Sequence, residues 1–186
     1  MTIPLVERIR GTPTSGTSEA EQALERAFEE HWSSVCETLR YLVGDADEAE
    51  DLALEAFWRL HTRPPRDQRN LGGWLHRVAT NLGLNALRAR QRRQRYEEAA
   101  GMLKLQRAEP KDPADEVEGR ETRERVRQVL SRMPRRKAQI LILRHTDHTY
   151  AEIADILGVA SGSVGTMLAR AEKTFERRYR ALEDVA

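Results

Sequence analysis

Residues 150–173 constrain the fold more than any other stretch, because they predict two helices that meet at a tight corner. Ile153, Ala154 and Leu157 share one face of a first helix, and Gly158 then supplies a residue that tolerates positive φ. A small residue where two helices cross, with a glycine at the turn, is typical of a helix-turn-helix. The pattern therefore predicts a DNA-binding corner, and an ordinary helical hairpin is the alternative.

Three amphipathic helices are predicted earlier in the chain, at residues 18–44, 45–63 and 71–95. Each has apolar residues at helical spacing, and the second ends at a pair of prolines. Ser18 has capping-box spacing to a glutamate three residues later, and Asp45 can cap the second helix. These helices form the first domain.

The second half begins with a weaker pattern and continues with further helices. Residues 97–118 mix charges with glycine and proline, as a tether does, and a charged helix is expected from Arg120. No run of alternating β-branched residues predicts a strand. We therefore predict an all-α fold of two small helical domains, 18–96 and 119–186, joined by a flexible linker and preceded by a disordered tail at 1–17.

The cysteine and histidine content argues against a catalytic or metal-binding protein. The single cysteine, Cys36, excludes an internal disulfide and a multi-cysteine zinc site, and its place on a helical face predicts a buried thiol. The five histidines are scattered, with neither metal-ligand spacing nor a partnered nucleophile, so each is expected to be exposed or hydrogen-bonded. We expect no enzyme activity, no metal and no cofactor. The histidines are His31, His61, His76, His145 and His148.

Charge is sorted into blocks although the 31 basic and 30 acidic residues nearly cancel. Residues 44–58 contain six acidic residues and no basic one. Acids at a helix start complement the helix dipole, which explains those at 45–48 better than Asp51 and Glu55. The alternative is a docking face for a basic protein partner. The apolar residues that we expect to serve such a face are the exposed candidates Phe57 and Trp58, with Leu52 and Leu54.

The third predicted helix has the opposite character. Arg77, Asn81, Asn85 and Arg88 recur at steps of four and three, along one polar face. Asparagine can pair with a base edge, and arginine binds phosphate or stacks on an exposed base. Five arginines fall within residues 88–95, a density that favours nucleic-acid contact over a merely solvated face. Trp74, at the start of this helix, is expected in the core.

An acidic docking face, a helix suited to nucleic acid and a helix-turn-helix follow one another in this chain, which resembles the extracytoplasmic-function sigma factors of bacterial RNA polymerase. The resemblance covers about residues 28–179. Its specific parts are AEDLALEAFWRL (49–60), GGWLHRVATNLGLNALR (72–88) and LRHTDHTYAEIADILGVASGSV (143–164). It implies a protein that binds core RNA polymerase, recognises promoter DNA and helps open it to start transcription.

The resemblance also implies three sets of binding residues. Those expected to bind the polymerase clamp are Asp51, Leu52, Glu55 and Phe57. Those expected to capture a flipped base of the minus-ten element and to follow the adjoining phosphates are Arg66, Gln68, Asn70, Arg77, Asn81, Asn85, Arg88, Arg92 and Arg93. Those expected to bind the minus-thirty-five element are Ser161, Gly162, Ser163, Thr166, Arg170 and Lys173.

Two departures from the family pattern change these expectations. Leu54 stands where relatives usually have glutamine, which makes the polymerase-binding face more apolar. Gly165, Met167 and Ala169 stand where relatives commonly have basic residues. Since each lost phosphate contact lowers the salt dependence of binding, the second domain should bind DNA weakly and with less salt sensitivity.

The resemblance further implies an anti-sigma partner and a protein that is a monomer when free. No apolar run is long enough to span a bilayer and the N-terminus lacks a signal sequence, so we expect a cytoplasmic protein without membrane insertion. The main alternative is a helix-turn-helix regulator that binds an operator as a dimer, without polymerase. It leaves the acidic face and the Asn81 helix without a role. A purely structural adaptor is a further alternative, and it predicts no DNA affinity.

Overall fold

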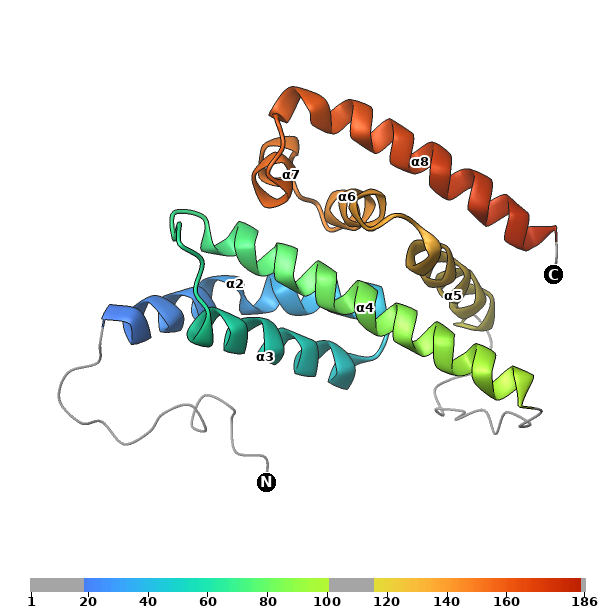
Figure 1. The fold of residues 1–186 in the computed structure, drawn as a ribbon, viewed down its shortest axis with the longest axis horizontal. Coiled ribbons are helices and arrows are strands. Elements are labelled where there is room, and N and C mark those ends of the chain that lie inside the picture. The colour runs from blue at the N-terminus through green and yellow to red at the C-terminus, as the bar shows by residue number, and fades with distance from the viewer. Residues whose placement is uncertain (1–18, 101–115, 185–186) are drawn as a thin grey trace.

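The structure is a computed structural model that describes residues 19–100 and 116–184, and every regular element within them is a helix (Figure 1). The all-α prediction is therefore confirmed for this part of the chain. The expected tail at 1–17 and the Ser18 cap lie outside the described residues. In chain order the helices are α2 (Glu19–Val43), α3 (Ala46–Thr62), α4 (Leu71–Ala99), α5 (Glu116–Arg132), α6 (Arg135–His145), α7 (Tyr150–Leu157) and α8 (Ser161–Glu183).

The turn between α2 and α3 is set by two adjacent residues. Gly44 has a φ of 79°, and a side chain there would meet the guanidinium of Arg127 from α5. Asp45 then caps α3, because its Oδ1 accepts a hydrogen bond of 2.7 Å from the backbone N–H of Glu48. The predicted cap is confirmed, and the proline pair follows the end of α3 as expected.

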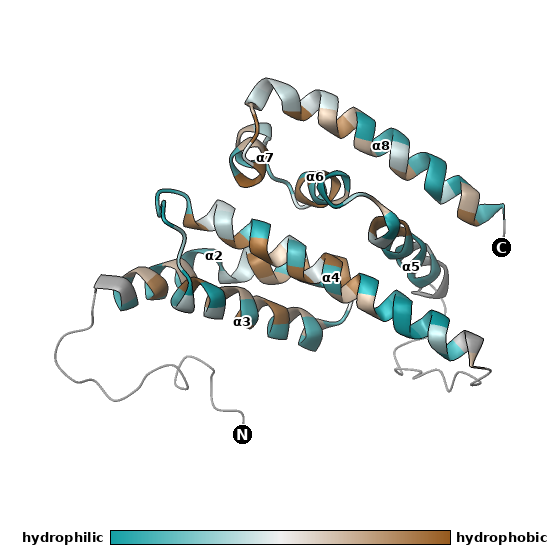
Figure 2. Cartoon of the chain, in the orientation of Figure 1, coloured by the Kyte–Doolittle hydropathy of each residue, from teal (hydrophilic) through white to brown (hydrophobic). Residues whose placement is uncertain are grey.

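The first three helices pack around an aliphatic core. Val35, Leu39 and Leu42 of α2 are fully buried with Ala49 of α3 and Leu75 of α4. Figure 2 shows the apolar residues gathered on the faces where helices meet. Cys36 lies in this core as predicted, and burial raises the pKa of its thiol to about 11. Within the two described ranges, no single helix is both long and apolar enough to cross a membrane.

The same core continues into the second half of the molecule. Residues of α5 and α6 join the cluster formed by α2, α3 and α4, and α4 contacts α5, α6 and α7. Figure 1 shows α5 and α6 lying between α4 and α8. The helices also extend into the predicted linker, since α4 runs to Ala99 and α5 begins at Glu116, four residues before the expected start. The residues that join the shared core are Val129, Leu130, Met133, Ala138 and Ile142.

The predicted corner is present between α7 and α8. Thr149 caps α7 in a reciprocal capping box with Glu152, and Gly158 ends the helix with a φ of 63°. The two helices meet at 90° over a second core that includes Ile153, Val164 and Leu168. This geometry matches a helix-turn-helix, so that prediction is confirmed.

Two glycines of the corner should respond in opposite ways to alanine. Gly158→Ala forces a side chain into a left-handed conformation and should lower the free energy of unfolding by about 1 to 2 kcal/mol. Gly165→Ala adds a helix-favouring residue within α8, where a Cβ would lie 3.8 Å from Tyr150 Cε2, an ordinary contact. It should raise the free energy of unfolding by about 0.5 to 1 kcal/mol. Urea unfolding measures both changes, and a loss of stability in Gly165→Ala would contradict this account.

Candidate nucleic-acid and protein-binding surfaces

The outer face at the start of α8 carries all six residues predicted for the minus-thirty-five set. Val164 and Leu168 face inward and are buried against α7, which turns the intervening residues outward. Ala160 occupies the N-cap and its side chain makes no capping hydrogen bond to the first backbone N–H groups of α8. A helix end of this kind can bind phosphate. The exposed residues are Ser161, Gly162, Ser163, Thr166, Arg170 and Lys173.

The three positions of α8 where relatives commonly have basic residues differ in their surroundings. Met167 is partly buried and packs against the corner's core, so its side chain belongs to the fold. Gly165 is partly buried and Ala169 is exposed. The outer face therefore begins with small hydroxyl side chains, and positive charge starts at Arg170.

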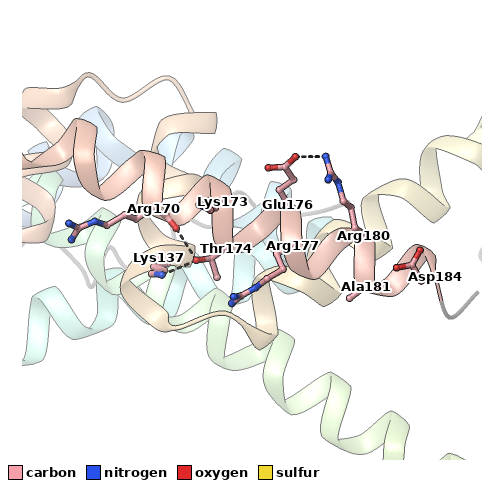
Figure 3. Close-up of a pocket in the computed structure, with 9 residues that line it drawn as sticks. All are labelled: Lys137, Arg170, Lys173, Thr174, Glu176, Arg177, Arg180, Ala181 and Asp184. Carbon is pink, nitrogen blue, oxygen red and sulfur yellow. Dashed lines mark hydrogen bonds and ion pairs between the residues drawn. The ribbon is translucent and has the colours of Figure 1, made fainter.

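A basic groove of about 630 Å³ continues from this face along α8 (Figure 3). Lys137 of α6 donates a 2.8 Å hydrogen bond to Thr174 Oγ1, which holds its charge in the groove. Glu176 is paired with Arg180 at 2.6 Å, so one of the groove's two acids is already neutralised. The excess positive charge favours an anion along this part of α8. The basic residues that line the groove are Lys137, Arg170, Lys173, Arg177 and Arg180.

Both asparagines of α4 bond to residues of α6, with Asn81 partly buried there and Asn85 still exposed to solvent. Gln139 is buried and donates hydrogen bonds of 3.2 Å to Asn81 Oδ1 and to Thr80 Oγ1. Arg135 donates a 3.0 Å hydrogen bond to Asn85 Oδ1. These contacts join positions 50 to 59 residues apart, so nothing in the local sequence patterns revealed Arg135 and Gln139. In this conformation, α6 covers part of the face that was predicted to read bases.

The arginine run at the end of α4 divides into two parts. The guanidinium of Arg88 donates hydrogen bonds of 3.0 Å to the backbone carbonyls of Ser131 and Met133, at the end of α5. Burial lowers the pKa of this guanidinium from its usual value. Arg92 and Arg93 are exposed, so they can meet phosphate without any rearrangement. Arg77, at the other end of the predicted face, is also exposed.

The loop before α4 has an ordered backbone turn and exposed side chains. Asn70 Oδ1 accepts a 2.6 Å hydrogen bond from the backbone N–H of Gly73, so this amide caps α4. Asp67 accepts hydrogen bonds from Arg69, the shortest of 2.7 Å, and these lower the pKa of the Asp67 carboxyl to about 2. Arg66 and Gln68 are exposed and face no such constraint. Trp74 packs against the core, as expected.

A pair of histidines joins α4 to the loop before α7. The His76 ring lies 4.4 Å from the His148 ring, edge to face, and His76 Nε2 lies 3.3 Å from Ser34 Oγ. His76 is only 6% exposed, and among the described residues its Nδ1 has no hydrogen-bond partner. The expectation that each histidine is exposed or hydrogen-bonded therefore holds for His76 through one ring nitrogen only, Nε2, because Nδ1 is buried without a partner in the described part of the chain. Burial, with smaller contributions from the charges of His148 and His31, lowers its pKa to about 4, while Glu152 acts in the opposite direction.

The acidic face of α3 contains only part of the set predicted for it. Asp51 is exposed, and Glu55 is paired with Arg59 at 2.8 Å. Leu52 packs partly against the core. Phe57 is 4% exposed, so the expectation of an exposed ring is wrong. Its ring packs against the stacked pair Phe28 and Trp32, with centroids 4.9 and 5.7 Å away, because an aromatic side chain gains more from this cluster than from water.

Comparison with known proteins identifies both halves of the chain. Residues 27–93 match the family model described as Sigma-70 region 2, and residues 123–175 match the one described as Sigma-70, region 4. A curated relative is the ECF RNA polymerase sigma factor SigW of Bacillus subtilis, with 28% identity over 150 residues. That alignment covers 76% of this chain and 80% of SigW.

A solved structure supports the same fold. The sigma factor RpoE of Bartonella quintana, solved in complex with the anti-sigma factor NepR, aligns with a TM-score of 0.50 and 16% identity. The alignment covers 86% of this chain and 98% of that one. At this identity the likeness concerns the arrangement of helices alone.

The buried histidine should make stability depend on pH in a defined window. His76 stays neutral in the fold down to about pH 4, whereas an unfolded histidine binds a proton below about pH 6.5. The contribution of neutral His76 to the free energy of unfolding is therefore fully present above about pH 6.5. The free energy of unfolding should fall by up to about 3 kcal/mol as the pH drops to about 4. Urea unfolding from pH 7.5 to 4 should show this slope, and His76→Gln should remove it. His61→Gln, at an exposed site, should keep it, and equal slopes for both variants would contradict the assignment.

Proposed function

The chain belongs to the sigma-70 family as an extracytoplasmic-function sigma factor, and we propose that it docks on core RNA polymerase through α3 and binds promoter DNA through α4 and α8. The function is binding and remodelling, without bond chemistry. Binding to an extruded base offsets the few kcal/mol that unstacking a base costs, and so favours the open strands.

The observation that carries the proposal is the outward face of α8 beside a core that fixes the corner. Six polar or small residues are presented together there, with the basic groove continuing from them. Such a helix fits the major groove, and its first residues would read the minus-thirty-five element. Arg92 and Arg93 would bind phosphates near the minus-ten element.

Promoter binding through α4 requires α6 to move, because Asn81, Asn85 and Arg88 already bond to the second half of the chain. We expect the bases of the minus-ten element to compete with Gln139 for Asn81, and DNA phosphate to compete with the α5 carbonyls for Arg88. The described conformation would then be a closed state, and its population sets the apparent DNA affinity.

The other partners follow from the family. RpoE of Bartonella quintana was solved with an anti-sigma factor, and we propose that this chain too is held by such a partner, which would mask its polymerase and DNA faces. After release from this partner, the free chain would be a cytoplasmic monomer.

Run-off transcription with purified core RNA polymerase and fragmented genomic DNA from the source organism tests the function as a whole. Discrete transcripts that appear only with this protein would support it. Specific DNA binding without any transcripts would overturn it in favour of a polymerase-independent helix-turn-helix regulator.

Asn81→Ala should abolish transcription from a duplex promoter, because the proposed base contact is lost, while polymerase affinity stays unchanged. Gln139→Ala is the matched control, since it removes the same Asn81 hydrogen bond and leaves the asparagine in place. Run-off assays and polymerase binding measure the two effects. If Asn81→Ala also lost polymerase binding, Asn81 would belong to the fold and not to the DNA site.

Loosening the α4–α6 contact should strengthen binding to a single-stranded minus-ten oligonucleotide. Arg135→Ala with Gln139→Ala removes the hydrogen bonds to Asn85, Asn81 and Thr80, and we expect a Kd about tenfold lower. Fluorescence anisotropy gives the Kd. Arg144→Ala controls for the lost charge, because this exposed arginine of α6 bonds only near α7. A weaker or unchanged Kd in the double variant would show that α6 does not compete with DNA.

A further inference from the structure

Trp58 is an unusual residue on the surface of α3. Its side chain is 61% exposed, while the other two tryptophans of the chain, Trp32 and Trp74, pack against the core. Tryptophan is usually well buried, because its ring loses more from contact with water than most side chains. Exposed large apolar side chains often mark contact sites for other proteins.

The helix itself explains why this ring faces outward. Phe57 fills the aromatic cluster with Phe28 and Trp32, and the next residue on a helix points about 100° away. Trp58 therefore cannot enter the same cluster. Its ring lies beside His61, with centroids 5.7 Å apart, and Thr62 Oγ1 donates a 2.9 Å hydrogen bond to its backbone carbonyl.

Trp58 continues a stripe that contains the acidic residues of the proposed docking face. Asp51, Leu54, Glu55 and Trp58 follow one another at steps of three, one and three, which places them on adjoining turns of one face. Asp51 is exposed with no ion pair among the described residues, and Leu54 is half-buried. The stripe thus joins negative charge to an apolar surface at one place.

We propose that Trp58 is the apolar anchor by which α3 docks on core RNA polymerase, inserting into an apolar pocket with a basic rim. This inference rests on the proposed function, and it names the residue that replaces Phe57 in that role. The charge of Asp51, unpaired among the described residues, steers the encounter with a basic surface, and the indole provides most of the lasting contact. Leu54 widens the apolar patch beside it.

Affinity measurements with the full chain and purified core polymerase test the assignment. Trp58→Ala should weaken the Kd by about thirtyfold, as removal of an interface hot spot does. The loss should persist at high salt, because the contact is apolar, whereas the loss caused by Asp51→Asn should shrink as salt screens the charge. Leu54→Gln should weaken binding by a smaller factor.

Tyr96→Ala is the matched control, since Tyr96 is 76% exposed on α4, away from the proposed stripe. It should bind polymerase as the unchanged chain does. Thermal melts of all variants should coincide within a few degrees, because these side chains are largely outside the core. Should Trp58→Ala fail to fold, Trp58→Gln and Leu54→Gln carry the same comparison.

The outcomes separate this inference from the function on which it rests. An unchanged chain that binds no polymerase would overturn the proposed function itself. Normal binding by Trp58→Ala, in a series where the unchanged chain binds, would overturn the role of Trp58 alone. Normal polymerase binding with impaired promoter opening would also overturn it, since the ring would then contact DNA.

Discussion

The packing of α5 and α6 on α4 is the interaction on which the rest of the structure depends. Val129, Leu130 and Met133 extend the core of the first three helices, so the two groups of helices share buried surface. Apolar burial contributes the free energy, and the hydrogen bonds of Gln139, Arg135 and Arg88 fix the register between them. Because α4 contributes to the shared core and carries the face proposed to read bases, folding and the proposed DNA recognition would compete for one helix surface.

In the proposed mechanism, this competition predicts the order in which polymerase, duplex DNA and the separated DNA strand bind. A ligand shifts an equilibrium only by its difference in affinity for the two states, and in the proposed mechanism promoter bases bind only the state in which α6 has separated from α4. The faces of α3 and α8 proposed to contact polymerase and duplex DNA include exposed residues in the closed arrangement, so those contacts would leave the shared interface untouched. Docking and minus-thirty-five recognition can therefore precede the separation that strand capture needs.

On α3, two adjacent aromatic residues were both expected to be exposed, and the expectation holds for Trp58 but not for Phe57. The acidic run and the exposed Trp58 could be read from the chain, since charge and helical spacing are local properties. The choice between Phe57 and Trp58 could not, because it depends on an aromatic cluster supplied by α2, some 25 to 29 residues earlier. Likewise the buried, half-satisfied His76 follows from its contacts with Ser34 and His148, which lie on other segments.

The sequence by itself determined the helices, the caps at Asp45 and Gly158, the corner between α7 and α8, and which residues of α8 face outward. These are decided by periodicity of 3.6 residues, by capping and by the conformational freedom of glycine, all of which act within a few residues. Only the tertiary structure decided that Gln139 meets Asn81, that Arg88 bonds to the end of α5 and that one core spans both halves. Such contacts join distant segments, and their partners are chosen by shape and by the need to pair buried polar groups, which no local pattern records.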